Sequence, residues 1–382
     1  MRNAEGGFFA TQDADSEGHE GKFFVWSKKE IEEVLGASRD SEIACDHFGV
    51  EDDGNFEDSD HSVLSLVKTD DELAKDYELP IAEIRQVLET AQNKLLYARE
   101  KRVKPFRDEK IMTSWNGLMI AAMAHAGAAL DAHELTLAAE KAFAFLESKL
   151  MKRDAGAVAL QRHVLGDAVK GPAFLDDYAF VADAALELYE ATSKPAYAIW
   201  ARDIAGTMLA KFWSEEESKF YFSGKDGEAL IVRPVDLFDH AIPSATSMAC
   251  RVLLRLGSLM HVKYMDLGRR ALGQVATAAI ENPFGFGQTL CELDRLVNGS
   301  TDVVIVTGGG DASALLQTAH ATYLPNRTIA LVEPNAESLE ACALLAEGKP
   351  AKTEPVAYVC RNQTCSAPVA SAEDLETLLA AR

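Results

Sequence analysis

Long apolar helices recur along the middle of the chain. Short polar or proline-containing sequences introduce them about 60 to 70 residues apart, at residues 114–117, 174–178 and 242–244. A second, more amphipathic helix follows each one and is predicted at residues 135–150, 195–212 and 264–280. A helix that is apolar almost all round has to be covered on every side, whereas its amphipathic partner can face water. The pattern therefore predicts repeated helical hairpins that form the inner and outer helices of an α/α toroid.

The two ends of the chain show different patterns. Ser27, with Glu30 three residues later, has the spacing of a capping box and predicts a short helix near the start. Further along, apolar strand-like runs at residues 303–306 and 328–332 flank a helical stretch, which predicts one βαβ unit. We therefore place the toroid at residues 1–300 and a small C-terminal α/β segment at residues 301–382.

Composition narrows the classes of ligand and partner. The chain has 382 residues, of which 48% are hydrophobic, enough to bury a large core in one or two domains. Its formal net charge of −22, without a local cluster of Lys or Arg, disfavours nucleic acid and anionic membranes and favours a neutral or cationic ligand. The longest apolar run, residues 117–130, is too short to span a bilayer, and residues 1–5 lack the apolar core of a signal peptide. We therefore expect a cytoplasmic protein without a membrane segment.

Six cysteines are scattered along the chain without the density of a disulfide scaffold, so most are expected to be reduced and buried. Cys360 and Cys365 differ from the others because only four residues separate them. This spacing is compatible with a metal-ligand pair, a redox pair or two thiols around a turn. The sequence has no second cysteine or histidine pair nearby to complete a zinc site. We favour two unbonded thiols around a turn, and we predict no metal and no cofactor.

An acidic segment near the start of the chain, with Asp13 and Asp15, is similar to the beginning of a calcium-binding loop. The twelfth position of such a loop should be a bidentate glutamate, but it is Phe24, and no helix is predicted before Asp13. We therefore expect these carboxylates to form an acidic lip over a cleft and to contact a ligand.

Two adjacent carboxylates begin the second apolar helix. Asp176 shares a stripe at helical spacing with Asp183, Glu187 and Glu190, which indicates a cap or a solvated group. Asp177 instead heads the buried face and is the better candidate to point into a cavity. A helix N-terminus stabilises an ionised carboxylate, which suits a base, a nucleophile or a hydroxyl acceptor. The alternative interpretation is that both carboxylates simply cap the helix.

Cleavage of a glycosidic bond requires two carboxylates that flank it. Asp239, just before the third apolar helix, and the acidic lip supply candidate partners for Asp177. The predicted catalytic residues are Asp177, Asp176 and Asp239. Aromatic rings stack on sugar faces and amides bond hydroxyls, although aromatics at helix starts also pack in cores and asparagine also caps helices. On this basis the predicted ligand-binding residues are Asp13, Asp15, Trp115, Asn116, Tyr178 and His240.

A sugar epimerase would instead place a base and an acid on either side of one carbon, a task for which paired histidines are well suited. His240 lies at a helix start, and His163 follows Arg162 in a predicted hairpin. His125 lies in the middle of an apolar helix, where we expect a core residue. These positions weaken the epimerase interpretation.

Several motifs occur in order along the chain. They are GGFF at residues 6–9, DADSEGHEGKFFVW at 13–26, TSWNGL at 113–118, FLDDYA at 174–179 and YVC at 358–360. Together they resemble the YyaL-like proteins related to spermatogenesis-associated protein 20, over essentially the whole chain. The resemblance implies a mainly α fold, an incomplete (α/α)6 toroid of the six-hairpin glycosidase-like type, similar to those of glycosidases and N-acylglucosamine 2-epimerases. It also implies a family whose members carry an N-terminal thioredoxin-like domain.

The chain departs from this family pattern at two places. It begins where family members are already inside the toroid, so we expect the thioredoxin-like domain and the first toroid helices to be absent and an apolar seam to be exposed. Residues 240–247 read HAIPSATS, where the family pattern is closer to Gly-Ala-x-Pro-Ser-Gly-Asn-Ser. That change alters the shape and the hydrogen-bond donors of this helix start.

Two functions of different classes fit these observations. The first is a toroid that binds or processes a small carbohydrate-like ligand in a cleft formed by helix N-termini, glycoside hydrolase-like or sugar epimerase-like if it is an enzyme. The second is a non-catalytic interaction domain that pairs with a separate thioredoxin-like chain. A truncated and impaired product is a third interpretation. The fold analogy behind the first is an association and does not establish a reaction.

Overall fold

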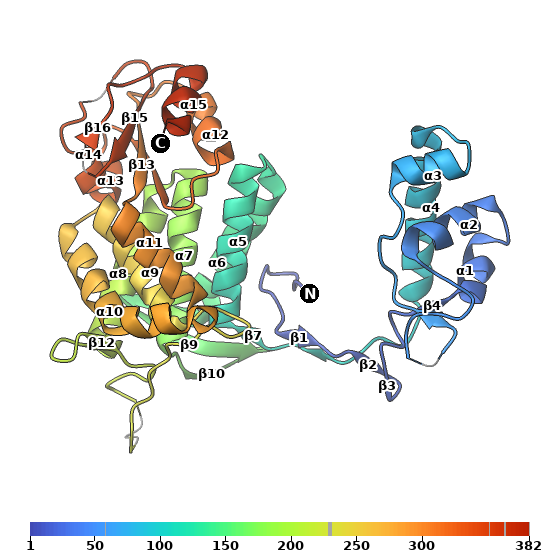
Figure 1. Cartoon of the computed structure of the whole chain (residues 1–382). Coiled ribbons are helices and arrows are strands. Elements are labelled where there is room, and N and C mark those ends of the chain that lie inside the picture. The colour runs from blue at the N-terminus through green and yellow to red at the C-terminus, as the bar shows by residue number, and fades with distance from the viewer. Residues whose placement is uncertain (58, 228–230, 351, 363, 382) are drawn as a thin grey trace. The chain divides into compact units, whose positions relative to one another are not determined.

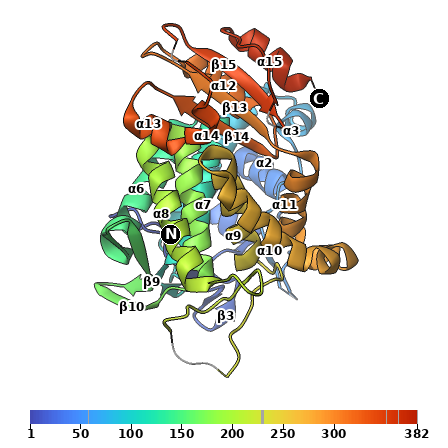
Figure 2. The ribbon, with the colours of Figure 1, turned by 90° about the vertical axis from the view of Figure 1, so that its left-hand side faces the viewer.

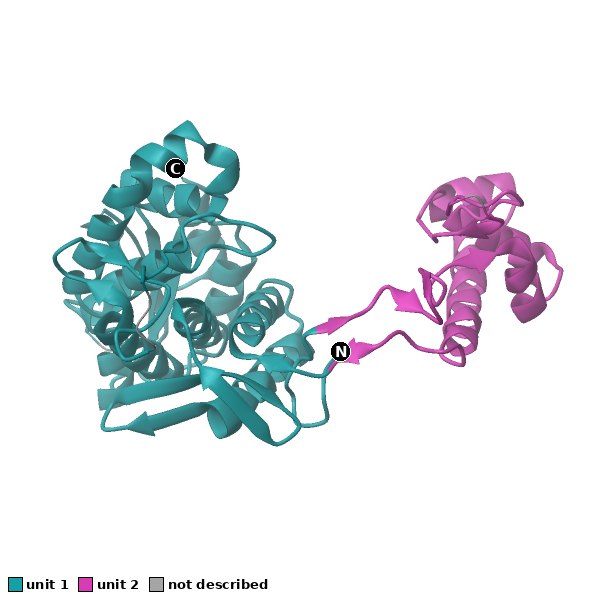
Figure 3. Ribbon diagram, turned by 90° about the horizontal axis from the view of Figure 1, so that it is seen from below, with its two compact units in different colours: residues 1–10, 109–382 teal, residues 11–108 magenta. Residues whose placement is uncertain are grey.

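The computed structural model describes residues 1–57, 59–227, 231–350, 352–362 and 364–381. The chain divides into two compact units: unit 1, residues 1–10 and 109–382, and unit 2, residues 11–108 (Figure 3). This division differs from the predicted boundary at residue 300. Residues 11–108 enclose apolar clusters of their own, around Trp26 and Ile84, whereas Val304 and Ala330 of the C-terminal strands share the core of the helical hairpins.

Unit 2 is helical and carries short strand pairs. The capping box predicted at Ser27 is confirmed, because its side chain accepts a hydrogen bond from the Glu30 N–H and the Glu30 carboxylate accepts one from the Ser27 N–H. Its elements are β1 (Thr11–Gln12), β2 (Asp15–Ser16), β3 (His19–Glu20), β4 (Trp26–Ser27), α1 (Lys28–Leu35), α2 (Arg39–Phe48), β5 (His61–Ser62), α3 (Asp70–Asp76), α4 (Ile81–Arg99) and β6 (Arg107–Asp108).

Helical hairpins dominate unit 1 (Figure 1). They are α5–α6 (Thr113–Ala129, His133–Leu150), α7–α8 (Leu175–Thr192, Pro195–Phe212) and α9–α10 (Ala245–Leu259, Val262–Glu281), followed by a 3-10 turn at Pro283–Gly285 and by α11 (Gly287–Asn298). The first helix of each pair packs on the first helix of the next, so α5, α7 and α9 form an inner row and α6, α8 and α10 an outer one. The prediction of a mainly α fold with an incomplete α/α toroid is confirmed.

The inner helices are packed tightly against one another. Residues 175–190 of α7 are all buried, as expected for a helix that is apolar almost all round and lies between two others. At Gly117 of α5, an added Cβ atom would lie 2.8 Å from the carbonyl carbon of Phe180, so only glycine allows this approach of the two backbones. On another face of α5, Trp115 and Met119 remain 40% and 42% exposed and form an apolar stripe, in line with the predicted seam.

Small strands lie at both ends of the inner helices. At their N-terminal ends, β7 (Ile111–Met112), β8 (Met151–Asp154) and β10 (Ala168–Pro172) pair antiparallel with the long β9 (Ala157–Leu165), and β11 (Trp213–Ser214) pairs with β12 (Lys219–Phe220). At the other end, β14 contacts α7 and α9 and belongs to a C-terminal sheet (Figure 2).

The C-terminal sheet contains the predicted βαβ unit. β13 (Thr301–Val306) and β14 (Arg327–Val332) are parallel and joined through α12 (Ser313–Ala321), and the strand order is β14-β13-β15-β16. The remaining elements are α13 (Ala336–Ala341), α14 (Ala343–Ala346), β15 (Val356–Arg361), β16 (Thr364–Cys365) and α15 (Ala372–Ala380). Among the described residues, no helix combines the length and the apolar character needed to cross a membrane.

The prediction of two unbonded thiols at Cys360 and Cys365 is wrong. These residues form a disulfide, with their Cα atoms 3.9 Å apart. The reason is the antiparallel pairing of β15 with β16, which places the two residues directly opposite each other. Of the other cysteines, Cys45, Cys250 and Cys342 are free and buried, and Cys291 is free and exposed.

Candidate functional site

The predicted carboxylate Asp177 joins the first turns of two inner helices. Its Oδ1 atom accepts a hydrogen bond from the Ser114 N–H of α5 at 2.9 Å, and its Oδ2 atom accepts one from the Phe174 N–H at 2.9 Å. A guanidinium nitrogen of Arg162, on β9, lies 2.8 Å from Oδ2. Asp177 is fully buried, so the prediction that it heads the buried face is confirmed. Its catalytic role stays a prediction.

Asp176 is not a solvated group, and this part of the sequence interpretation is wrong. It is buried and accepts two hydrogen bonds from Arg162, at 2.6 and 2.7 Å. Burial, together with the charge of Asp176, raises the pKa of Asp177 to about 7, although Arg162 and the Phe174 N–H act in the opposite direction. Two carboxylates therefore share one guanidinium at this helix start, in an arrangement that ties β9 to α7.

Asp239 holds two other helix starts together. Its Oδ1 atom accepts a hydrogen bond from the N–H of Ser244, the N-cap of α9, and its Oδ2 atom accepts one from the N–H of Gln288 in the first turn of α11, at 2.8 and 2.7 Å. Both oxygens are thus used as helix caps. Catalysis by Asp239 also stays a prediction.

The predicted ligand-binding residues fall into three groups. Tyr178 is buried and its hydroxyl accepts a hydrogen bond from the Leu160 N–H at 3.1 Å, which contradicts a ligand-facing role. Asn116 is buried and bonds both the N–H and the C=O of Phe8, at 2.8 and 2.9 Å, so it anchors the first residues of the chain on α5. Trp115 and His240 of unit 1 and Asp13 and Asp15 of unit 2 are exposed, and their roles stay predictions.

A buried network of charges lies further along the inner helices, and sequence analysis missed it. Asp183, Glu187 and Glu190 of α7 are buried and face Arg251 and Arg255 of α9. The two arginines contact these carboxylates at 2.7 to 3.1 Å. The signal for it was present, because arginines four residues apart interrupt an otherwise apolar helix and match the spacing of the acidic stripe.

Two neighbouring elements extend the network. Glu292 of α11 lies 3.6 Å from Arg251 and 3.7 Å from Arg295 of the same helix. Arg327 of β14 lies 4.0 Å from Glu190. The network then contains as many carboxylates as guanidinium groups: Asp183, Glu187, Glu190 and Glu292 face Arg251, Arg255, Arg295 and Arg327. Buried charges are tolerated when they are paired in this way.

His125 of α5 joins this network and is not a core residue, contrary to the prediction. Its side chain is 51% exposed, and its Nδ1 atom lies 3.1 Å from the Glu187 carboxylate, whose side chain is 7% exposed. Burial disfavours the ionised form of Glu187, but the charges of Arg255 and Arg251 and the contact with His125 outweigh burial and hold its pKa well below the usual range. The pair is therefore a histidine held by an ionised carboxylate.

A cavity of about 230 Å³, here called the axial cavity, opens onto this network. It is lined by His125, Glu187, Glu190, the four arginines of the network and residues 323–325 of the loop between α12 and β14. Within the described part of the chain, the Nε atom of Arg255 and the Nη1 atom of Arg295 are buried and have no hydrogen-bond partner. The site therefore offers donors and acceptors on the same wall.

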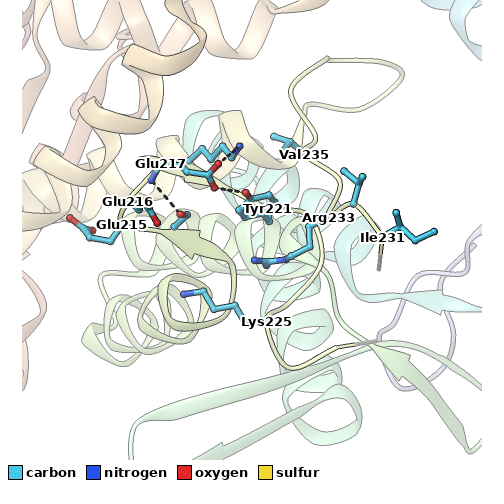
Figure 4. A pocket seen from close by; sticks show the side chains of 11 residues that line it. Glu215, Glu216, Glu217, Tyr221, Lys225, Ile231, Arg233 and Val235 are labelled. Atoms are coloured by element: carbon cyan, nitrogen blue, oxygen red, sulfur yellow. Dashed lines mark hydrogen bonds and ion pairs between the residues drawn. The ribbon is translucent and has the colours of Figure 1, made fainter. Parts of the chain in front are cut away.

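A second hollow, of about 710 Å³, lies beside β11 and β12 (Figure 4). Two of its charged groups pair with each other: Glu217 lies 2.9 Å from Lys219 and also accepts a hydrogen bond from the Tyr221 hydroxyl. Arg233 lies over the Tyr221 ring, 4.2 Å from its centre. The Nε atom of Arg233 is buried and has no hydrogen-bond partner among the described residues. We regard the axial cavity as the better candidate site because its wall brings His125, the ionised Glu187 and two arginines with unpartnered donors together from four helices.

Comparison with known proteins confirms the resemblance seen in the motifs. The human spermatogenesis-associated protein 20 is 30% identical over 423 aligned residues, which cover 99% of this chain and 52% of that protein. The mouse protein is 29% identical with the same coverage. The chain is similar to spermatogenesis-associated protein 20 over essentially its whole length. It spans about half the length of the curated relatives it matches, and no protein-family model matches it.

Solved structures with similar helix arrangements are more distant. The GH76 α-mannanase of Bacteroides thetaiotaomicron has a TM-score of 0.41 at 12% identity, covering 68% of this chain and 79% of the mannanase. The cellobiose 2-epimerase of Bacillus thermoamylovorans has a TM-score of 0.39 at 10% identity, covering 72% of this chain and 66% of the epimerase. These likenesses carry no argument about the activity of the chain.

Proposed function

We propose that the axial cavity binds a small, hydroxyl-rich ligand of the carbohydrate type. The observation that supports this proposal is that the wall of the cavity carries guanidinium N–H donors in contact with carboxylate acceptors. A sugar hydroxyl both donates and accepts hydrogen bonds, so it can use both kinds of group at once. The wall itself carries four guanidinium groups and the two carboxylates of Glu187 and Glu190, while Asp183 and Glu292, which do not line the cavity, complete the charge balance of the network.

The pair of His125 and Glu187 gives this site a means of proton transfer. When the Glu187 carboxylate accepts a hydrogen bond from Nδ1–H, the Nε2 atom of His125 is left to accept a proton from a ligand. An ionised Glu187 does not serve as the protonated acid that glycoside hydrolysis needs. Within the carbohydrate proposal we therefore favour epimerase-like proton abstraction over hydrolysis, and we place it at His125 instead of at the helix N-termini.

Thermal unfolding with a panel of monosaccharides and disaccharides tests binding, because a ligand of the native state raises the midpoint. We expect one sugar class to stabilise the wild type and to stabilise His125→Gln less. The control is His133→Gln, at an exposed position that begins α6. Exchange of a carbon-bound sugar proton for deuterium, followed by NMR in heavy water, then tests proton abstraction. The binding proposal fails if no sugar shifts the wild type or if both variants respond as the wild type does.

A non-catalytic interaction domain is the second candidate, and the apolar stripe of Trp115 and Met119 favours it. The resemblance proposes a thioredoxin-like chain as the partner. In that case Trp115→Ala would weaken binding of a thioredoxin-like domain measured by calorimetry, whereas His125→Gln would not change it. Absence of any heat of binding for the wild type would remove this candidate.

A further inference from the structure

Another cavity, of about 510 Å³, lies between the α9–α11 helices and the C-terminal sheet, and Arg295 lines both this cavity and the axial cavity. The disulfide of Cys360 and Cys365 forms part of its wall, so we call it the disulfide cavity. The charged residues of its lining are Arg269, Arg295, Lys349, Asp302 and Glu347. Neither the helical network described above nor the proposed carbohydrate site uses the disulfide.

The disulfide cavity has polar groups without partners. Within the part of the chain that the structure describes, the Nη1 atom of Arg295 and the Oδ1 atom of Asp302 are buried and lack a hydrogen-bond partner. The amine of Lys349 donates to the Leu345 carbonyl at 2.8 Å, which holds it at the cavity wall. Burial raises the pKa of Asp302 and lowers that of Lys349, because it disfavours the charged form of each group. A ligand group of opposite charge would stabilise the charged form of either one.

The two sulfur atoms differ in access. Cys365 is exposed on β16, whereas Cys360 on β15 is only 4% exposed. An incoming thiolate therefore reaches the sulfur of Cys365, and the sulfur of Cys360 is the leaving group. Arg295 and Lys349 line the same cavity as Cys360, and a nearby cationic side chain stabilises a thiolate.

We propose that the Cys360–Cys365 disulfide is a reactive centre that exchanges with a small thiol carrying a carboxylate. The carboxylate of the small thiol binds Lys349 and Arg295, and its thiolate attacks the sulfur of Cys365. A new sulfur–sulfur bond forms to Cys365 while the bond to Cys360 breaks, and Cys360 leaves as a thiolate that takes up a proton. A second small thiol then attacks the mixed disulfide, which releases the oxidised small molecule and leaves both cysteines reduced.

The test compares thiols of different charge on the whole, folded chain. Reduction of the disulfide by 3-mercaptopropionate, 2-mercaptoethanol and cysteamine is stopped by alkylation and followed by mass spectrometry of the peptide that contains both cysteines. Rates are expressed per thiolate, because the reactive species is the ionised form. We expect the anionic thiol to react about three- to fivefold faster than the neutral one, a size typical of a partly exposed charge pair. Its rate should also saturate with concentration.

Two variants separate recognition from general reactivity. Lys349→Gln should abolish the preference for the anionic thiol, whereas Lys152→Gln, at an exposed position of β8 outside the cavity, should retain it. Circular dichroism of both variants checks that the fold is intact. The net charge of −22 by itself repels an anionic thiol, so a slower reaction of 3-mercaptopropionate than of 2-mercaptoethanol would overturn the proposal. A disulfide that resists all three thiols until the chain is unfolded would overturn it as well.

Discussion

Replacement of Arg255 by methionine tests whether the axial network depends on charge balance. Arg255 is fully buried, and its guanidinium nitrogens lie 2.7, 2.9 and 2.8 Å from carboxylate oxygens of Asp183, Glu187 and Glu190. Methionine keeps much of the volume but removes the charge and its donors, which leaves these carboxylates under-compensated. Removing one partner of a buried ion pair costs about 3–5 kcal/mol of unfolding free energy. We expect Arg255→Met to lower the melting temperature by roughly 10 °C.

The loss of unfolding free energy in Arg255→Met should be larger at high pH than at low pH. In the folded chain the charge of Arg255, against the opposing effect of burial, helps to hold the pKa of Glu187 well below the usual range. The stability that Glu187 contributes is therefore present above its unfolded pKa of about 4.3 and is lost as pH falls towards the folded value. Without Arg255, the buried carboxylates relieve their repulsion by taking up protons. The deficit of Arg255→Met relative to the wild type should be largest near pH 8 and smaller at pH 5.

Urea unfolding followed by circular dichroism at both pH values measures this deficit. The matched control is Arg269→Met, which replaces an exposed arginine 3.6 Å from Asp266, and it should cost less than about 1 kcal/mol. A deficit below about 1 kcal/mol for Arg255→Met at pH 8 would refute the reasoning. A deficit that does not shrink at pH 5 would show that the remaining carboxylates are not the source of the cost.

Three further predictions concern the contacts between the helices. Burial and the charge of Asp176 raise the pKa of Asp177 from 3.8 to about 7. The stability that Asp177 contributes is therefore present below pH 3.8 and lost as pH rises through about 7. Asp177→Asn should remove this pH dependence of the unfolding free energy, measured by urea titrations between those pH values. Gly117→Ala should lower the melting temperature, because its Cβ would meet backbone atoms of α7, whereas Gly206→Ala, in open space on α8, should stabilise by up to about 1 kcal/mol. Asn116→Ala should speed hydrogen exchange at residues 1–10 and cost about 1–3 kcal/mol, since it removes both hydrogen bonds that anchor them.

Each of these three has an outcome that would contradict it. An unchanged pH slope in Asp177→Asn would mean that this carboxyl group titrates in the folded chain as it does in the unfolded one. Equal melting temperatures for the two glycine variants would mean that α5 and α7 separate without cost. Unchanged exchange at residues 1–10 in Asn116→Ala would mean that other contacts hold this segment.

The hairpin architecture could be predicted because its signals are local. Each inner helix is apolar almost all round, and the helix that follows it is apolar on one side only. This pattern predicted outer helices at residues 135–150, 195–212 and 264–280. The structure has them at His133–Leu150, Pro195–Phe212 and Val262–Glu281. The periodicity of a helix is a property of neighbouring residues, so it survives in any tertiary arrangement.

The carboxylates at the helix start were only half predictable. Their helical phase correctly predicted that Asp177 is buried, but it set Asp176 apart as a cap or a solvated group, and Asp176 is buried as well. The phase did not reveal that Arg162, in the preceding β9–β10 hairpin, folds back and covers Asp176. A carboxylate that looks solvated on its own helix becomes buried when another element brings a counter-charge.

The sequence by itself determined which segments are helices, which faces of them are apolar and where charged residues stand along each face. Only the tertiary structure decided which charges meet. The acidic stripe of α7 is buried because α9, more than 60 residues further on, places Arg251 and Arg255 across from it, and Cys360 bonds Cys365 because β15 and β16 pair in register. A buried charge or a disulfide requires a partner at a defined distance, and that distance is set by packing between elements that sequence periodicity does not describe.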